Sequence, residues 1–208
     1  MLRTMVFVGS LTNLTDARYA AGMGVEYLGF VVNAALPQFV EPTLYKNMAE
    51  WLAGVKLIGQ VGAATPDEVN ALLSQYALHG IATTNPETAA YASEHGLEVF
   101  LTIKGTEILQ PATAAFLAQQ QPNAAYFILE NEEDNSPLND QEKEQLRLLA
   151  TAYPLVLGYG FDAQNVCSLL DALPLSGIAL RGGGEEIRPG FKDLSDLADV
   201  LEQLEAAD

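Results

Sequence analysis

The alternation of short apolar runs with amphipathic segments is the feature that most constrains how this chain can fold. Eight strand-then-helix units fit head to tail along the 208 residues, which leaves about 26 residues for each unit. The expected strands are Met5–Val8, Glu26–Val32, Lys56–Val61, Tyr76–Ala82, Leu97–Ile103, Ala124–Glu130, Pro154–Tyr159 and Ser176–Leu180. The pattern predicts an α/β fold, a single (β/α)8 TIM barrel that spans residues 1–208 as one domain.

Helix-start signals follow several of the expected strands. Thr65 and Glu68 form a capping-box pattern at the start of the third helix. We expect the first helix to be capped at Thr12 or Asn13, and the seventh helix to be capped by Asp162. These helix starts mark the loops that connect each of those expected strands to the helix that follows it.

A doubly wound open sheet is the main alternative, because it also alternates strands and helices. Its dinucleotide-binding fingerprint is missing after the first strand, where Gly9-Ser10-Leu11 stands. Eight units joined by short loops favour closure into a barrel.

Charge and cysteine content exclude several classes of partner. A formal net charge of −17 opposes binding to nucleic-acid phosphates or to an anionic membrane surface. No apolar run is long enough to cross a bilayer, and the first four residues lack the layout of a signal peptide. The one cysteine excludes an intrachain disulfide and fits a reducing cytoplasm. We therefore expect a cytoplasmic protein with no nucleic-acid or membrane partner.

The last two expected strands each end in a glycine-rich loop. The candidate phosphate-binding residues in these loops are Gly158, Tyr159, Gly160, Arg181, Gly182, Gly183 and Gly184. A (β/α)8 barrel places its phosphate site here, because bare backbone N–H groups approach an anion closely. Arg181 can neutralise such an anion, although it can equally be a surface cation beside ordinary tight turns. No group of His, Cys, Asp and Glu has metal-ligand spacing, so no metal is expected.

Several segments of the chain, taken in order, resemble one protein family. The segments are Gly9-Ser10-Leu11-Thr12-Asn13, Asp16-Ala17, Glu26–Phe30, Leu36–Val40, Leu78-His79-Gly80, Leu157–Asp162, Asn165-Val166, Gly183, Glu185 and Pro189–Asp193. Together they resemble the phosphoribosylanthranilate isomerases of tryptophan biosynthesis, and Leu78-His79-Gly80 is similar to the end of that family's fourth strand. The resemblance spans nearly the whole chain.

This resemblance implies an Amadori rearrangement that needs neither cofactor nor metal. A general acid opens a phosphorylated ribosylamine ring, and a general base removes a proton from the adjacent sugar carbon. In the family the base is a cysteine after strand one, the acid is an aspartate after strand six, and an arginine after strand two holds the substrate's carboxylate. These positions fall here on Gly9, Glu130 and Gln38. Gly9 has no side chain and Gln38 has no cationic fork, whereas Glu130 is chemically competent as the acid.

Three functions remain open on the sequence. The first is an isomerase-type barrel, monomer or homodimer, that binds a phosphorylated sugar-type small molecule, with Glu130 as the catalytic acid. The second is an inactive relative that binds a phosphate metabolite or a protein partner, which the missing base favours. The third is an isomerase or aldolase-like enzyme with another substrate.

Overall fold

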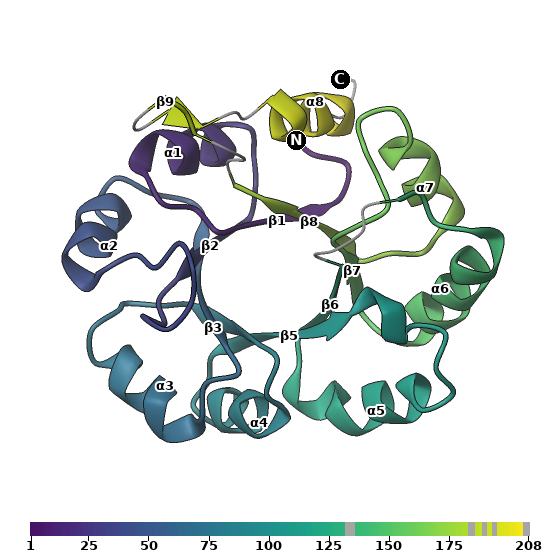
Figure 1. Cartoon of the computed structure of the whole chain (residues 1–208), viewed down its shortest axis with the longest axis horizontal. Coiled ribbons are helices and arrows are strands. Elements are labelled where there is room, and N and C mark those ends of the chain that lie inside the picture. Colours follow the sequence, from purple (N-terminus) through teal and green to yellow (C-terminus); the bar gives the residue numbers. More distant parts are fainter. Residues whose placement is uncertain (132–135, 183–185, 189–190, 193–194, 206–208) are drawn as a thin grey trace.

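The computed structural model describes residues 1–131, 136–182, 186–188, 191–192 and 195–205. Eight parallel strands close into a barrel, and helices pack around its outside (Figure 1). The strands are β1 (Met5–Gly9), β2 (Tyr27–Val31), β3 (Lys56–Gly62), β4 (Gly80–Thr83), β5 (Glu98–Lys104), β6 (Tyr126–Glu130), β7 (Leu155–Leu157) and β8 (Gly177–Arg181). The helices are α1 (Leu14–Gly22), α2 (Pro42–Ala49), α3 (Pro66–Leu73), α4 (Pro86–Glu94), α5 (Thr113–Gln120), α6 (Asp140–Ala152), α7 (Val166–Ala172) and α8 (Ser195–Leu204).

The first and last strands pair with each other and so close the barrel. Their register runs from Met5 opposite Gly177 to Gly9 opposite Arg181. An open sheet would leave both strands as edges, so the (β/α)8 prediction is confirmed and the doubly wound alternative is wrong. Two short 3₁₀ helices, η1 (Gly105–Glu107) and η2 (Gln121–Asn123), and a two-stranded pair, β9 (Glu186–Arg188) and β10 (Phe191–Lys192), complete the described elements.

Alternating strand residues divide the core into two layers. Val6 and Val8 face the helices, whereas Met5 and Phe7 point into the barrel. The inner layer contains packed aromatic rings: the Phe100 ring centroid lies 5.2 Å from that of Phe7. The inner-layer residues are Met5, Phe7, Tyr27, Ile58, Ala82, Phe100, Ile128, Val156 and Ala179. Because these side chains fill the barrel interior, a ligand can enter only above them, at the carboxyl ends of the strands.

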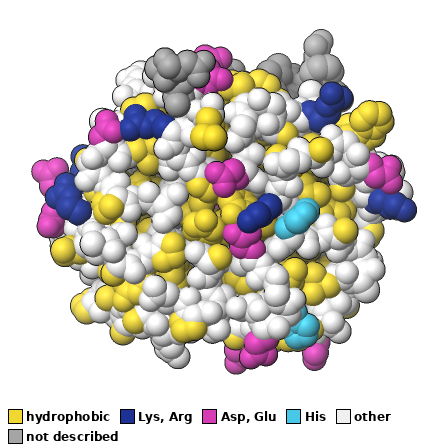
Figure 2. All heavy atoms as spheres, turned by 180° about the vertical axis from the view of Figure 1, so that it is seen from behind, with side chains coloured by type: hydrophobic (Ala, Val, Ile, Leu, Met, Phe, Trp, Pro, Cys, Tyr) yellow, Lys and Arg dark blue, Asp and Glu magenta, His cyan; other side chains and the backbone are white. Residues whose placement is uncertain are grey.

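A polar cluster covers the amino-terminal end of the barrel. The Lys56 ammonium lies 2.6 Å from a Glu98 carboxylate oxygen, and the Tyr27 hydroxyl donates to the same carboxylate at 2.7 Å. Figure 2, seen from behind Figure 1, shows basic, acidic and histidine side chains gathered over apolar ones near the middle of that face. This cluster seals the end opposite the loops that follow the strands.

The fourth strand differs from the expectation. It begins at Gly80, so residues 76–79 of the expected strand precede it, and His79 lies at the amino-terminal end of the barrel. The His79 ring nitrogen Nδ1 accepts the Leu57 backbone N–H at 3.0 Å. The expected strand Tyr76–Ala82 therefore began four residues too early, and His79 has a structural role.

Most of the expected helix starts are confirmed. The Thr65 and Glu68 capping box is present, and Asn13, not Thr12, caps α1 by accepting the Asp16 backbone N–H. Asp162 does not cap α7, because the helix begins four residues later. Its carboxylate accepts the backbone N–H groups of Gln164 and Asn165, which forms a tight turn before the helix. Among the described residues, no helix is long and apolar enough to cross a membrane.

Candidate functional site

Three connected hollows make up the mouth of the barrel, at the carboxyl ends of the strands. A central hollow of about 240 Å³ is lined by residues such as Ser10, Gln38 and Gln60. A second hollow of about 570 Å³ lies beside β5 and β6, and a third of about 560 Å³ lies between β7, β8 and α8. Glu130 lines the central and β5–β6 hollows, and Arg181 lines the central and β7–β8 hollows. These two residues therefore stand where the three hollows meet.

Glu130 and Arg181 come from strands that are two apart in the barrel and face each other across the mouth. An Arg181 guanidinium nitrogen lies 3.9 Å from a Glu130 carboxylate oxygen. The Arg181 side chain is 53% exposed and the Glu130 side chain is 24% exposed. Both charged groups can therefore contact a ligand in the central hollow. A carboxylate so placed can exchange a proton with that ligand, and a guanidinium can bind an anionic group on it.

Next to Arg181, the wall of the mouth carries a glycine on each of β1 and β2, Gly9 and Gly29. Gly9 ends β1, and a Cβ placed on it would lie 2.9 Å from Phe7 Cε1 and 3.0 Å from Gln60 Nε2. A Cβ on Gly29 in β2 would lie 3.1 Å from Gln60 Oε1. The Gln60 carboxamide, which reaches across from β3, thus occupies the space above both glycines. Among the described residues, the side chains nearest to these two positions are those of Phe7 and Gln60, neither of which accepts a proton at neutral pH.

Gln38 lies in the loop between β2 and α2, next to the central hollow. Its φ of +61° is in the left-handed region, which is uncommon for a residue with a side chain. It lines the central hollow together with Leu36 and Pro37. Gln38, Glu130 and Arg181, which the sequence proposed as site residues, are therefore brought to one hollow.

Gly158 and Gly182, at the ends of the last two strands, lie where the barrel leaves little room for a side chain. Gly158 donates its backbone N–H to Leu129 O at 2.8 Å, and Gly182 donates its own to Gly9 O at 2.7 Å. A Cβ on Gly158 would lie 2.8 Å from Leu129 O, and one on Gly182 would lie 2.5 Å from Leu11 Cδ2. These two N–H groups therefore serve the barrel's own hydrogen bonds. Gly183 and Gly184 lie outside the described residues.

Tyr159 and Gly160 lie behind the mouth. The Tyr159 side chain is buried, and its hydroxyl donates to Gly105 O at 3.4 Å. Burial, together with the nearby Glu142 charge, raises the pKa of Tyr159 to about 12. Gly160 makes the turn with a φ of +77°, which favours glycine. The residues at this position pack the loop against the barrel.

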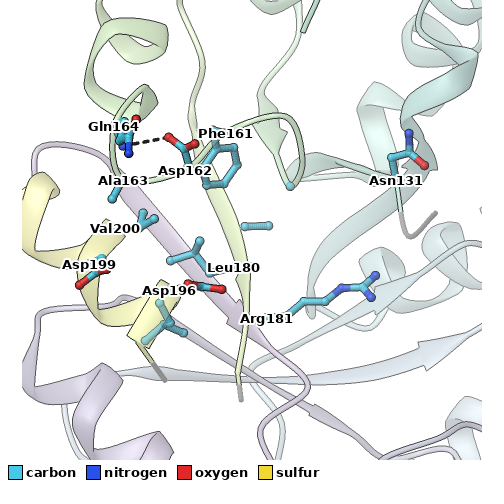
Figure 3. Close-up of a pocket in the computed structure, with 13 residues that line it drawn as sticks. Asn131, Phe161, Asp162, Ala163, Gln164, Leu180, Arg181, Asp196, Asp199 and Val200 are labelled. Atoms are coloured by element: carbon cyan, nitrogen blue, oxygen red, sulfur yellow. Dashed lines mark hydrogen bonds between the residues drawn. The ribbon is translucent and has the colours of Figure 1, made fainter. Parts of the chain in front are cut away.

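Acidic side chains surround the β7–β8 hollow. Asp162, Asp196 and Asp199 line it and are exposed, and Asp196 lies in the first turn of α8. Figure 3 shows the Arg181 side chain pointing away from Asp196 and Asp199, on the side of the hollow where Asn131 lies. The cation is therefore presented to the centre of the mouth, while the helix-side wall is negative. Within the described part of the chain, no three His, Cys, Asp or Glu side chains gather as metal ligands do.

Gln60 is the residue of the mouth that sequence reasoning missed. It is a polar residue inside the otherwise apolar run of the third strand, and that exception was the available signal. Thr84, Thr102 and Asn131 also line the mouth and were not singled out. Each stands at or just after a strand's carboxyl end, where small polar residues also serve loop geometry.

Comparison with known proteins places this architecture among relatives of similar length. No protein-family model matches the chain. A curated relative named N-(5'-phosphoribosyl)anthranilate isomerase, from Gloeobacter violaceus, is 27% identical over 205 residues, which cover 94% of this chain and 91% of the relative. The resemblance drawn from the sequence segments is therefore confirmed.

Solved structures agree on the fold. Phosphoribosyl anthranilate isomerase from Thermus thermophilus superposes with a TM-score of 0.76 at 22% identity, covering 96% of this chain and 98% of that one. A second phosphoribosyl anthranilate isomerase structure, in complex with reduced 1-(o-carboxyphenylamino)-1-deoxyribulose 5-phosphate, has a TM-score of 0.74 at 17% identity. It covers 97% of this chain and 98% of that one.

Proposed function

We propose that this relative of the phosphoribosylanthranilate isomerases binds a phosphorylated sugar-type small molecule, linked to a carboxylated aromatic amine, in the mouth of its barrel. The observation that carries the proposal is the Glu130–Arg181 pair, which places one carboxylate and one guanidinium at the meeting point of the three hollows. The ligand's chemistry is suggested by the carboxyphenylamino ribulose phosphate bound to a protein of the same fold. By the same relationship, the reaction is the aldose–ketose isomerisation of tryptophan biosynthesis.

The ligand carries two anionic groups, a carboxylate and a phosphate, and the charges differ between the hollows that could receive them. Arg181 faces the central hollow, where an aromatic carboxylate or a phosphate can pair with its guanidinium. Asp196 and Asp199 make the α8 side of the β7–β8 hollow unfavourable for a phosphate. A phosphate at that end would need the backbone N–H groups of Gly183 and Gly184, which remain a prediction.

Glu130 has the position for the acid step. In the proposed reaction, Glu130 gives its proton to the ring oxygen as the bond between that oxygen and the anomeric carbon breaks, which leaves an iminium ion. A base must then take a proton from the neighbouring carbon. The electron pair of the broken C–H bond neutralises the iminium ion and forms an enolamine, which tautomerises to the ketone. Gly9 supplies no such base, and Gln60 above it is neutral at every physiological pH.

The glycine wall therefore favours a second candidate function, in which the barrel binds the same class of ligand without turning it over. Loss of a general base costs about a hundred- to ten-thousand-fold in rate. The two candidates share the binding site and differ only in the proton-removal step.

Two measurements separate these candidates. Loss of phosphoribosylanthranilate fluorescence reports turnover, and a ligand-dependent rise in melting temperature reports binding. In Glu130→Gln, which keeps the side-chain volume, we expect binding to persist and any turnover to vanish. Glu87→Gln, on the exposed side of α4, is the control and should match the wild type. Absence of a melting shift with either phosphoribosylanthranilate or its reduced product analogue would refute the proposed function.

We further propose that residues 1–208 form one domain that works in the cytoplasm as a monomer or homodimer, without a cofactor or metal. The net charge of −17 also supports the absence of nucleic-acid and anionic membrane partners. Sedimentation of the purified protein gives its oligomeric state. Retention on a DNA column at physiological salt would contradict the nucleic-acid prediction.

A further inference from the structure

One polar side chain lies over the glycine positions of β1 and β2 at the mouth. Gln60 is half-buried on β3, and its carboxamide lies next to the positions where side chains of Gly9 and Gly29 would begin. Phe7 closes the same space from below, since a Cβ on Gly29 would lie 2.7 Å from Phe7 Cζ. The Gln60 carboxamide therefore brings polar chemistry to this wall, beside Ser10, which lines the same hollow.

The orientation of this carboxamide is fixed by the loop after β1. The Ser10 backbone N–H donates to Gln60 Oε1 at 2.5 Å. A backbone N–H can only donate, so the amide oxygen must face Ser10 and the amide nitrogen occupies the other edge of the group. Ser10 itself has a φ of +59°, in the left-handed region, so the hydrogen bond that it donates to Gln60 helps to hold an uncommon backbone conformation.

The two walls of the mouth consequently offer different chemistry. Glu130 and Arg181 bring charges from β6 and β8. Gln60, which lines the same central hollow, brings a neutral group with two N–H donors on Nε2 and one further lone pair on Oε1. A donor of this kind suits a hydroxyl or carbonyl oxygen, which are the oxygens of a sugar.

We propose that Gln60 is a ligand-binding residue that donates a hydrogen bond to a sugar oxygen of the bound molecule. This inference rests on the proposed function and adds to it the residue that recognises the sugar. It also explains why β1 and β2 carry glycines at this level, because a side chain on either strand would displace the carboxamide.

The test is calorimetric titration of the full chain with reduced 1-(o-carboxyphenylamino)-1-deoxyribulose 5-phosphate. Gln60→Ala removes the donor, and Gln60→Glu removes it while keeping an oxygen for the Ser10 N–H. Gln119→Ala, exposed on α5, is the matched control. A second probe has the same aromatic carboxylate and phosphate, but its sugar hydroxyls are replaced by hydrogens.

We expect Gln60→Ala to bind the full probe about 2- to 13-fold more weakly than the wild type, as for one lost hydrogen bond. Gln60→Glu should bind it more weakly still, because a carboxylate would face an anionic ligand. Gln60→Ala should bind the deoxygenated probe as the wild type does, since that probe has no hydroxyl to lose. Gln119→Ala should bind both probes normally.

Three results would overturn the assignment in distinguishable ways. If the wild type binds the full probe and both Gln60 variants match it, only the role of Gln60 falls. The role of Gln60 also falls if Gln60→Ala weakens the binding of both probes by the same factor. If the wild type binds neither probe, the proposed function is refuted, and the assignment of Gln60 is refuted with it.

Discussion

The Arg181 guanidinium on β8 lies 3.9 Å from the Glu130 carboxylate on β6, so the two charges meet over the open end of the barrel. Arg181 is therefore held at the centre of the mouth and not against the acidic side chains at the start of α8. A ligand anion that enters the central hollow would find the guanidinium already oriented by its carboxylate partner. The pair thus links the binding of an anion to the environment of the proposed acid.

Replacing Arg181 should weaken binding of an anionic ligand. We expect Arg181→Ala to bind the reduced product analogue about 10- to 100-fold more weakly, because hydrogen bonds between charged groups are lost. Arg181→Lys should recover part of this loss, since it restores the charge but not the planar fork. Calorimetric titration measures both. Because Arg181 is half exposed, the wild-type affinity should also fall as salt is added.

The control for this prediction is Arg147→Ala, which removes an exposed cation on α6 that pairs with Glu144. Its affinity for the analogue should equal that of the wild type. An Arg181→Ala protein that binds the analogue with unchanged affinity would show that Arg181 serves only its partner Glu130.

The pairing of β1 with β8 predicts which glycine the barrel cannot replace. A Cβ on Gly177 would collide with the Met5 backbone carbonyl and lie 3.0 Å from Met5 Cε. Gly177→Ala should therefore lower the free energy of unfolding by about 1–3 kcal/mol or more. Gly22→Ala is the matched control, because nothing lies within 4 Å of its Cβ, and at the end of α1 it should raise stability by up to about 1 kcal/mol. Urea denaturation decides, and equal stabilities of the two variants would contradict the argument.

The buried Tyr159 hydroxyl predicts a loss of stability in alkali. Its pKa is raised to about 12 in the folded protein, whereas the pKa of a tyrosine in the unfolded chain is about 10. The contribution to stability is therefore complete below pH ~10 and is lost between pH ~10 and 12, because the unfolded state releases its proton first. Tyr159→Phe should reduce the slope of unfolding free energy against pH in that range by up to about 1.4 kcal/mol per pH unit. Denaturation at pH 8, 10.5 and 11.5 measures it, and an unchanged slope would count against this burial.

The sequence predicted the barrel because its evidence is periodic and repeated. Apolar runs of strand length recur eight times, and the capping box at Thr65 and Glu68 marks a helix start by local chemistry. The fourth strand was placed too early because Tyr76 and Leu78 extend the apolar run. Tyr76 is instead buried beside Tyr45, outside the sheet. Local composition could not separate a strand residue from one that packs under a helix.

The candidate site was predicted in part. Glu130 and Gln38 were identified from the family resemblance and Arg181 from the loop after the eighth strand, and all three line one hollow. The filling of the space above Gly9 could not be predicted, because it depends on a side chain from another strand, Gln60. Which backbone N–H groups are engaged also depends on strand register. The Gly182 N–H, expected to face a phosphate, donates to Gly9 O.

The position of Gln60 makes a gain of activity testable with one isosteric change. Gln60→Glu keeps the side-chain length and the bond from the Ser10 N–H, and it places a carboxylate in the space above Gly9. A carboxylate there can accept the proton that the neutral carboxamide cannot. At saturating phosphoribosylanthranilate, we expect the turnover rate to rise by about a hundredfold over the wild type, at the low end of what a general base contributes.

Two controls accompany this last variant. Gln119→Glu adds the same charge on the exposed side of α5 and should leave the turnover rate unchanged. The double variant Gln60→Glu, Glu130→Gln should lose the gain, because the new base has no substrate to act on until Glu130 has opened the ring. A Gln60→Glu protein that folds and binds the ligand, yet turns over no faster than the wild type, would show that this wall does not face the reacting carbon.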